Sequence, residues 1–207
     1  YTAQDTSVQF WDGANTIANG VINGGSGIWS GPGIGDSSNN WTNVDGSSNR
    51  RWAGNFAVFQ GAAGTVSLTT THDITGMQFL TDGYELTHFR PAGLNLVNGA
   101  LGNAAIRVDP GVTATLNVTI VGSGALGKYD AGTLVLNEYN WYSGGTALNG
   151  GTLVLGHNLA LGTGALTSAG GTTLDSNRAI SVRNDVTLNG ALTIAGSNTL
   201  SLDGTVS

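Results

Sequence analysis

Several residues could, by type and order, form a nucleophilic active site. Gly35-Asp36-Ser37 has the order found at the start of some serine hydrolase motifs, and His72 or His88 could act as the base that a serine nucleophile needs. However, residues 31–40 have the composition of a loop throughout, and no strand-to-helix turn follows them. His72 lies in a polar threonine run ahead of a strand, where we expect an exposed side chain. We therefore interpret these residues as structural and predict no catalytic residue.

Polysaccharide cleavage is a second possibility, because it needs paired carboxylates. The candidates show no clustering in the sequence and are Asp73, Asp82, Glu85, Asp109 and Glu138. A lyase would also need cations near the acids, and Arg90, Arg107 and Lys128 follow one another at intervals close to the length of one coil. That spacing could stack three cations on one face, although solvated surface charges explain it more simply. The calcium-binding pattern G-G-x-G-x-D does not recur, so we predict no metal and no cofactor.

Aromatic residues could provide stacking surfaces for sugars or proteins. Trp29, Trp41, Tyr84, Tyr139, Trp141 and Tyr142 are the candidates. Alternation along the chain turns Tyr139 and Trp141 outward. We therefore predict Tyr139 and Trp141 as binding residues, together with Arg90 and Arg107.

The elements that would position these residues are repeated strands. Gly-Thr-Leu-Val-Leu occurs at residues 132–136 and again at 151–155, and related segments begin at Gly170 and Gly190. Within each segment two apolar or small residues alternate, as they do in a strand with one buried face. The expected inward pairs are Leu134 and Leu136, Leu153 and Leu155, Thr172 and Leu174, and Leu192 and Ile194. A period of about 19 residues predicts a solenoid whose walls are β-strands, with about 11 coils if it runs through the whole chain.

Composition supports an all-β protein and excludes other classes. The 207 residues include 34 Gly but only 3 Pro, 40% are hydrophobic, and no segment has the periodicity of a capped helix. The net charge is −6 with only seven Lys and Arg, so a face that follows nucleic-acid phosphates is not expected. Cysteine is absent, so the chain contains no disulfide.

We expect one continuous domain with two parts. Residues 1–55 contain four of the five tryptophans in Asn-, Ser- and Gly-rich segments, so we predict an irregular N-terminal cap or first coils there. Residues 56–207 form the coils, including a distinctive repeat at about residues 126–155. The last residues stop in mid-repeat, so we expect the chain to be a piece of a longer protein.

That distinctive repeat resembles the passenger-associated transport repeat of bacterial autotransporters. The positions that match the pattern are Leu126, Lys128, Gly132, Thr133, Leu134, Leu136, Asn140, Tyr142, Gly144, Thr146, Gly151, Thr152, Leu153 and Leu155. Asp130 and Glu138 depart from it, since both replace glycines. Asp tolerates the left-handed backbone region better than Glu does. Residues 40–84 are similar to the N-terminal part of many passenger modules.

The resemblance implies a right-handed parallel β-helix that is exported through the periplasm and displayed on a Gram-negative cell surface. It also implies translocation by an outer-membrane β-barrel of the same polypeptide. We expect a non-enzymatic adhesin or stalk whose repeat aids folding-driven secretion. Its partner would be a protein or glycan of the host surface or the extracellular matrix, or another copy on a neighbouring cell through self-association. We expect no nucleic-acid partner. A carbohydrate-active β-helix remains the alternative, as a polysaccharide lyase or hydrolase.

Overall fold

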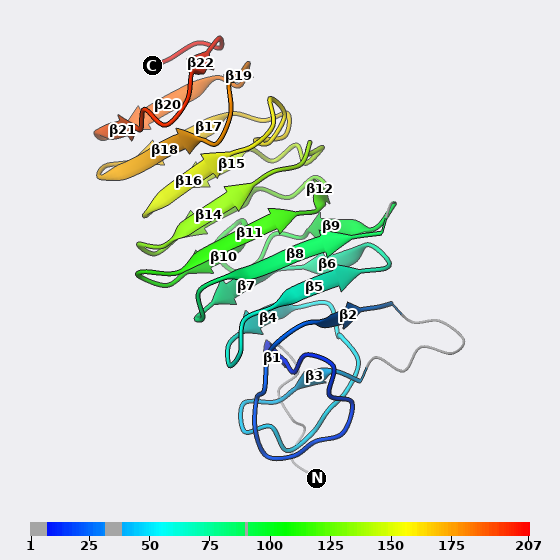
Figure 1. Ribbon diagram of the computed structural model, residues 1–207. Helices are drawn as coiled ribbons and strands as arrows, with labels where there is room; N and C mark the ends of the chain where they lie inside the picture. Colours follow the sequence, from blue (N-terminus) through cyan, green and yellow to red (C-terminus); the bar gives the residue numbers. More distant parts are fainter. Residues whose placement is uncertain (1–7, 32–38, 90) are drawn as a thin grey trace.

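The computed structural model describes residues 8–31, 39–89 and 91–207, which form a stack of parallel β-strands (Figure 1). The described residues contain no helix, and hence none long and apolar enough to cross a membrane. Most coils contribute one strand to each of two long sheets, and several coils add a strand to a shorter sheet. Figure 1 shows the coils in chain order, with the C-terminus at the opposite end of the stack from the N-terminal strands.

The first long sheet has nine strands: β1 (Val8–Trp11), β3 (Trp41–Thr42), β4 (Phe56–Phe59), β7 (Gly76–Phe79), β10 (Ala104–Val108), β13 (Leu126–Tyr129), β15 (Thr146–Leu148), β17 (Leu166–Ala169) and β20 (Val186–Asn189). The second has eight: β2 (Gly27–Trp29), β5 (Thr65–Leu68), β8 (Tyr84–His88), β11 (Thr113–Asn117), β14 (Thr133–Leu136), β16 (Thr152–Leu155), β18 (Thr172–Ser176) and β21 (Leu192–Ile194). Two shorter sheets comprise β6 (His72–Ile74), β9 (Gly93–Leu96) and β12 (Thr119–Val121), and β19 (Ile180–Val182) and β22 (Leu200–Leu202).

The strand register confirms the predicted solenoid. β14 pairs in parallel with β16, which places Leu134 beside Leu153 and Leu136 beside Leu155. All four leucines are at most 1% exposed, and they continue columns of buried side chains through neighbouring coils. A parallel strand bonds only to the coils on either side of it, so these leucines form an interior that a single coil could not make.

The predicted number of coils is too high. The second sheet contains eight strands, fewer than the expected coils, because residues 1–55 contribute few strands and because coil length varies. Leu116 pairs with both Leu86 and Leu136, so the coil that ends at Leu116 is longer than the coil that begins there. The other coils from β5 onward stay close to the predicted period, since Val66 pairs with Leu86 and Leu174 with Ile194.

The inward pair predicted at Thr172 and Leu174 is displaced in register. Leu174 pairs with Leu153, and Ser176, not Leu174, pairs with Leu155. The coil is two residues longer than the period assumed. An even insertion keeps the same side chains on the inner face, so Thr172 and Leu174 are both buried.

The last predicted inward pair follows in register but is not buried. β21 pairs Leu192 with Thr172 and Ile194 with Leu174. Ile194 is nevertheless 45% exposed. β21 is the outermost strand of the second sheet in the part of the chain that the structure describes, so no further strand covers this side chain.

The tryptophans form the predicted N-terminal cap. Trp11, Trp29 and Trp41 are at most 1% exposed, and the ring of Trp41 meets those of Trp11 and Trp29 edge-on at centroid distances of 5.2 and 4.7 Å. β3 runs antiparallel to β1, whereas β4 lies parallel on the other side of β1. The outer edge of β1 is therefore paired, and its backbone groups are not open to another chain.

Candidate functional site

The residues considered for nucleophilic catalysis are not assembled into a site. Gly35-Asp36-Ser37 lies outside the described residues. His72 is only 5% exposed; its ring stacks on Trp29 at a centroid distance of 4.7 Å, and its Nε2 lies 3.2 Å from the Trp29 carbonyl oxygen. The prediction of an exposed His72 is therefore wrong, because β6 turns this side chain inward.

Four of the candidate carboxylates accept hydrogen bonds, each from a neighbouring coil. Asp73 accepts from Asn95, Asp82 from the Thr113 amide, Glu85 from Asn117, and Asp109 from Gln78. Among the residues that the structure describes, no three His, Cys, Asp or Glu side chains are grouped so that they could hold a metal ion. These carboxylates therefore link coils to one another.

Arg107 and Lys128 do not stack on one face as the possible row of cations would require. Arg90, the third candidate, lies outside the described residues. β10 and β13 pair Ile106 with Lys128 and Arg107 with Tyr129, so Lys128 faces inward and Arg107 outward. Arg107 forms an ion pair with Asp130 at 2.8 Å.

Asp130, which replaces a glycine of the family pattern, adopts the left-handed backbone conformation that favours glycine. It has a φ of 64° and is the sole non-glycine residue with positive φ in the described ranges. This agrees with the tolerance expected of Asp. Glu138, the other departure from the pattern, does not need that conformation.

Lys128 is an interior residue of the repeat, with no exposed surface. Its Nζ donates to three main-chain carbonyl oxygens, at 2.8 Å to Tyr129, 2.8 Å to Asp130 and 3.0 Å to Gly150. Burial lowers the pKa of Lys128 to about 8, against a smaller opposing effect of the Asp130 charge. The ammonium group thereby ties the turn after β13 to the next coil.

Asn140 is a second buried polar residue of the repeat, 1% exposed. Its Oδ1 accepts from the Ile120 amide at 2.8 Å, and its Nδ2 donates to the Ala160 carbonyl oxygen at 2.7 Å. These partners belong to the preceding and following coils. Regular strand pairing on this side stops at β12 and resumes at β19. The side-chain amide therefore replaces a peptide group where the third sheet is interrupted.

The other matched positions of the repeat are also structural in type. Tyr142 is fully buried, its hydroxyl lies 2.6 Å from Thr146 Oγ1, and burial raises its pKa. Gly151 has a φ of 64° and approaches the Gly132 carbonyl so closely that a side chain would collide with it. The strand positions Thr133, Leu134, Leu136, Thr152, Leu153 and Leu155 lie in β14 and β16, Leu126 lies in β13, and Gly144 packs against Gly124 and Ala125.

The interrupted side of the stack carries the predicted outward aromatics. Trp141 is 55% exposed, and its ring meets Tyr139 edge-on at a centroid distance of 6.0 Å. Tyr139 in turn contacts the ring of His157 in the next coil at 6.0 Å. The chain thus presents three connected rings, of which His157 was not predicted.

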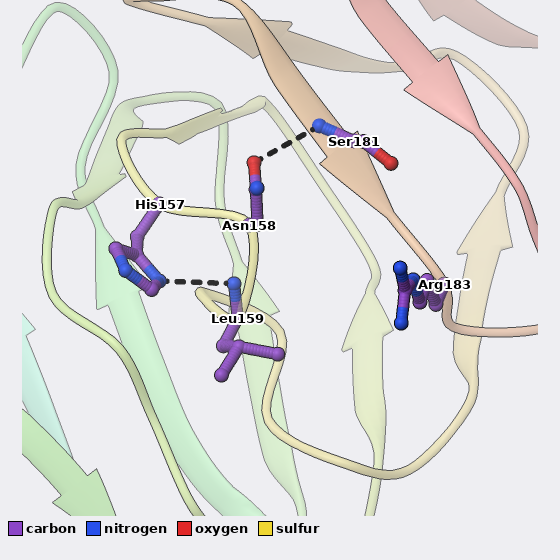
Figure 2. A pocket seen from close by; sticks show the side chains of 5 residues that line it. All are labelled: His157, Asn158, Leu159, Ser181 and Arg183. Atoms are coloured by element: carbon purple, nitrogen blue, oxygen red, sulfur yellow. Dashed lines mark hydrogen bonds between the residues drawn. The ribbon is translucent and has the colours of Figure 1, made fainter.

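A pocket of about 310 Å³ adjoins these rings and is lined by His157, Asn158, Leu159, Ser181 and Arg183 (Figure 2). Asn158 Oδ1 accepts from the Ser181 amide at 3.0 Å, and His157 Nδ1 accepts from the Leu159 amide at 3.0 Å. The lining comes from two consecutive coils. The sequence did not predict the pocket, because the residues that line it lie outside the repeated segments whose register was predicted.

The chain is similar to a segment of the adhesin BmaC autotransporter of Brucella suis biovar 1 (strain 1330), with 38% identity over 169 residues. The similarity covers 75% of the chain and 5% of that adhesin. No protein-family model and no solved structure matches the chain. Together with the parallel β-solenoid, this similarity confirms the resemblance to autotransporter passenger segments.

Proposed function

We propose that this β-helix is a non-enzymatic segment of an adhesive autotransporter passenger that is displayed on or released from a bacterial cell surface. The similarity to an autotransporter adhesin over 75% of the chain is the observation that carries the proposal. The stack itself supports a stalk, because its coils hold exposed side chains on a rigid support. The partner would be a surface protein or glycan of a host cell, an extracellular-matrix component, or a copy on a neighbouring cell.

The contact surface that we propose is the interrupted side of the stack. There Trp141 exposes more than half of its surface and its ring lies against that of Tyr139, so two aromatic rings share one surface. Trp and Tyr are among the residue types that contribute most to binding energy at protein contacts. Arg107 remains a further candidate, since its side chain is 41% exposed beside Asp130.

We expect beads coated with the chain to adhere to host epithelial cells or matrix-coated surfaces, and Trp141→Ala to lower the bound number about 10-fold. Phe89→Ala is the matched control, because Phe89 is a 60% exposed aromatic elsewhere on the stack. Bead clumping without cell attachment would favour self-association. Turnover of polysaccharides by the same protein would instead support the carbohydrate-active alternative. Beads that neither attach nor clump would contradict the adhesive function.

A further inference from the structure

Within the described residues, the mainly apolar pocket between His157 and Arg183 also holds hydrogen-bond donors that have no protein acceptor. His157 Nδ1 accepts a hydrogen bond from the Leu159 amide, so in the neutral ring the proton lies on Nε2. Asn158 uses its Oδ1 for the Ser181 amide, which leaves the Nδ2 group as a donor. Within the described ranges the Arg183 guanidinium makes no hydrogen bond or ion pair. Three kinds of donor therefore line one small cavity.

Asp203, whose carboxyl group senses the charge of Arg183, does not fill this need. Asp203 accepts hydrogen bonds from the hydroxyl groups of Ser181 and Ser201. Those two hydroxyls are the main reason why the pKa of Asp203 is lowered, and the charge of Arg183 contributes least. Arg183 is exposed and keeps its planar set of donors available to a ligand.

Aromatic rings continue the cavity on one side. His157 lines the pocket and contacts Tyr139, which contacts the exposed ring of Trp141. Sugar rings present apolar C–H faces to such aromatic surfaces while their oxygens accept hydrogen bonds at the edge. A volume of about 310 Å³ is at the small end of ligand pockets and suits a single sugar unit.

We propose that this pocket binds an acidic sugar unit of a glycan, with its carboxylate or sulfate group on Arg183 and Asn158 and the adjoining unit against Tyr139 and Trp141. The donors of His157, Asn158 and Arg183 favour a ligand rich in acceptors, and the guanidinium favours a negative one. Leu159, 40% exposed, supplies the apolar contact within the pocket. This inference rests on the proposed adhesive function and names the ligand class of its contact surface.

Intrinsic fluorescence of the purified chain can measure this binding, because Trp141 is exposed whereas Trp11, Trp29 and Trp41 are buried. The probes are tetragalacturonate, which carries carboxylates, a heparin-derived tetrasaccharide, which carries sulfates as well, and neutral chitotetraose. We expect saturable binding of at least one acidic probe below about 1 mM, and at least about 10-fold weaker binding of the neutral probe. A preference between the two acidic probes distinguishes carboxylate from sulfate recognition.

Arg183→Gln is expected to weaken the acidic probe about 10-fold, whereas Arg178→Gln, at an exposed arginine outside the pocket, leaves it unchanged. Calorimetry with Trp141→Ala, which lacks the reporter ring, should also show weaker binding. Equal binding of chitotetraose, no saturable binding of any probe at about 10 mM, or unchanged affinity in Arg183→Gln would overturn the proposal. Coated beads that still adhere to cells in any of those cases would leave the adhesive function intact.

Discussion

Asn140→Ala is expected to lower the free energy of unfolding by about 3 to 5 kcal/mol, because it leaves two buried main-chain groups without partners. The Ile120 amide loses its acceptor and the Ala160 carbonyl loses its donor, and both lie in the interrupted part of the third sheet. A loss of this size is exceptional for one polar side chain. It follows here because one amide connects three successive coils.

Urea unfolding followed by circular dichroism measures this effect. Asn149→Ala is the matched control, since Asn149 is exposed and makes a single local bond to the Ala147 carbonyl; we expect it to cost less than about 0.5 kcal/mol. Under the proposed export to the cell surface, Asn140→Ala should also lower the amount of protein displayed there, because folding of stacked coils would oppose backsliding. Similar losses in both variants would contradict the bridging role of Asn140.

Lys128→Met is expected to destabilise the chain by about 3 kcal/mol at pH 7, because three partly buried carbonyl oxygens lose their donor. Met keeps the length of the side chain without its charge. Lys128 is the only lysine in the sequence, so acetylation of its amine, followed by mass spectrometry, reports its burial directly. We expect slow acetylation of the native chain and rapid acetylation in urea.

The same pair of proteins should show a dependence on pH. The pKa of Lys128 is lowered from 10.5 to about 8 in the folded chain, so between those values the unfolded chain binds more protons. The contribution of Lys128 to the free energy of unfolding therefore rises with pH between about 8 and 10.5. Below pH 8 the amine is charged in both states, and the full cost of burying its charge is present. The wild type should gain about 2 kcal/mol relative to Lys128→Met between pH 8 and 10.

The comparison with Lys128→Met removes the effect of other groups. Burial raises the pKa of Tyr84 to about 12 and also raises that of Tyr142, so both tyrosines remain protonated in the folded chain after they ionise in the unfolded one. They destabilise both proteins equally above about pH 10. If the difference in unfolding free energy between the wild type and Lys128→Met instead became smaller from pH 8 to 10, the prediction would be contradicted. The three carbonyl oxygens would then stabilise the protonated amine by more than burial destabilises it.

Much of the fold could be predicted because one pentapeptide occurs twice at a spacing that equals a coil. The repeat predicted the pairing of Leu134 with Leu153 without further information. It did not predict the pairing of Leu155 with Ser176, because a two-residue insertion preserves the alternation of faces and leaves no mark in the pattern. Extension of the same period to residues 1–55 overestimated the number of coils.

The candidate site was less predictable, and the reasons differ between residues. Lys128 alternates with Leu126 in one strand, a signal for the inner face that was outweighed by the rarity of fully buried lysine. Tyr139 and Trp141 precede and follow the buried Asn140, so alternation placed them correctly. His157 and Arg183 line one pocket, but they lie in neighbouring coils outside the repeated segments, so the period did not place them together.

Cross-linking tests the parallel stacking of the coils most directly, because the chain has no cysteine of its own. Val135 pairs with Val154 on the neighbouring strand of the second sheet, and Val154 pairs with Asp175 on the strand after that. Val135 and Val154 are therefore one rung, or strand spacing, apart, whereas Val135 and Asp175 are two rungs apart. Neighbouring rungs lie about 4.8 Å apart, within reach of a disulfide, and two rungs lie about 9.6 Å apart, beyond it. The stack predicts rapid oxidation of V135C/V154C to an intramolecular disulfide and none in V135C/D175C. Failure of the first pair, or equal cross-linking of both, would contradict it.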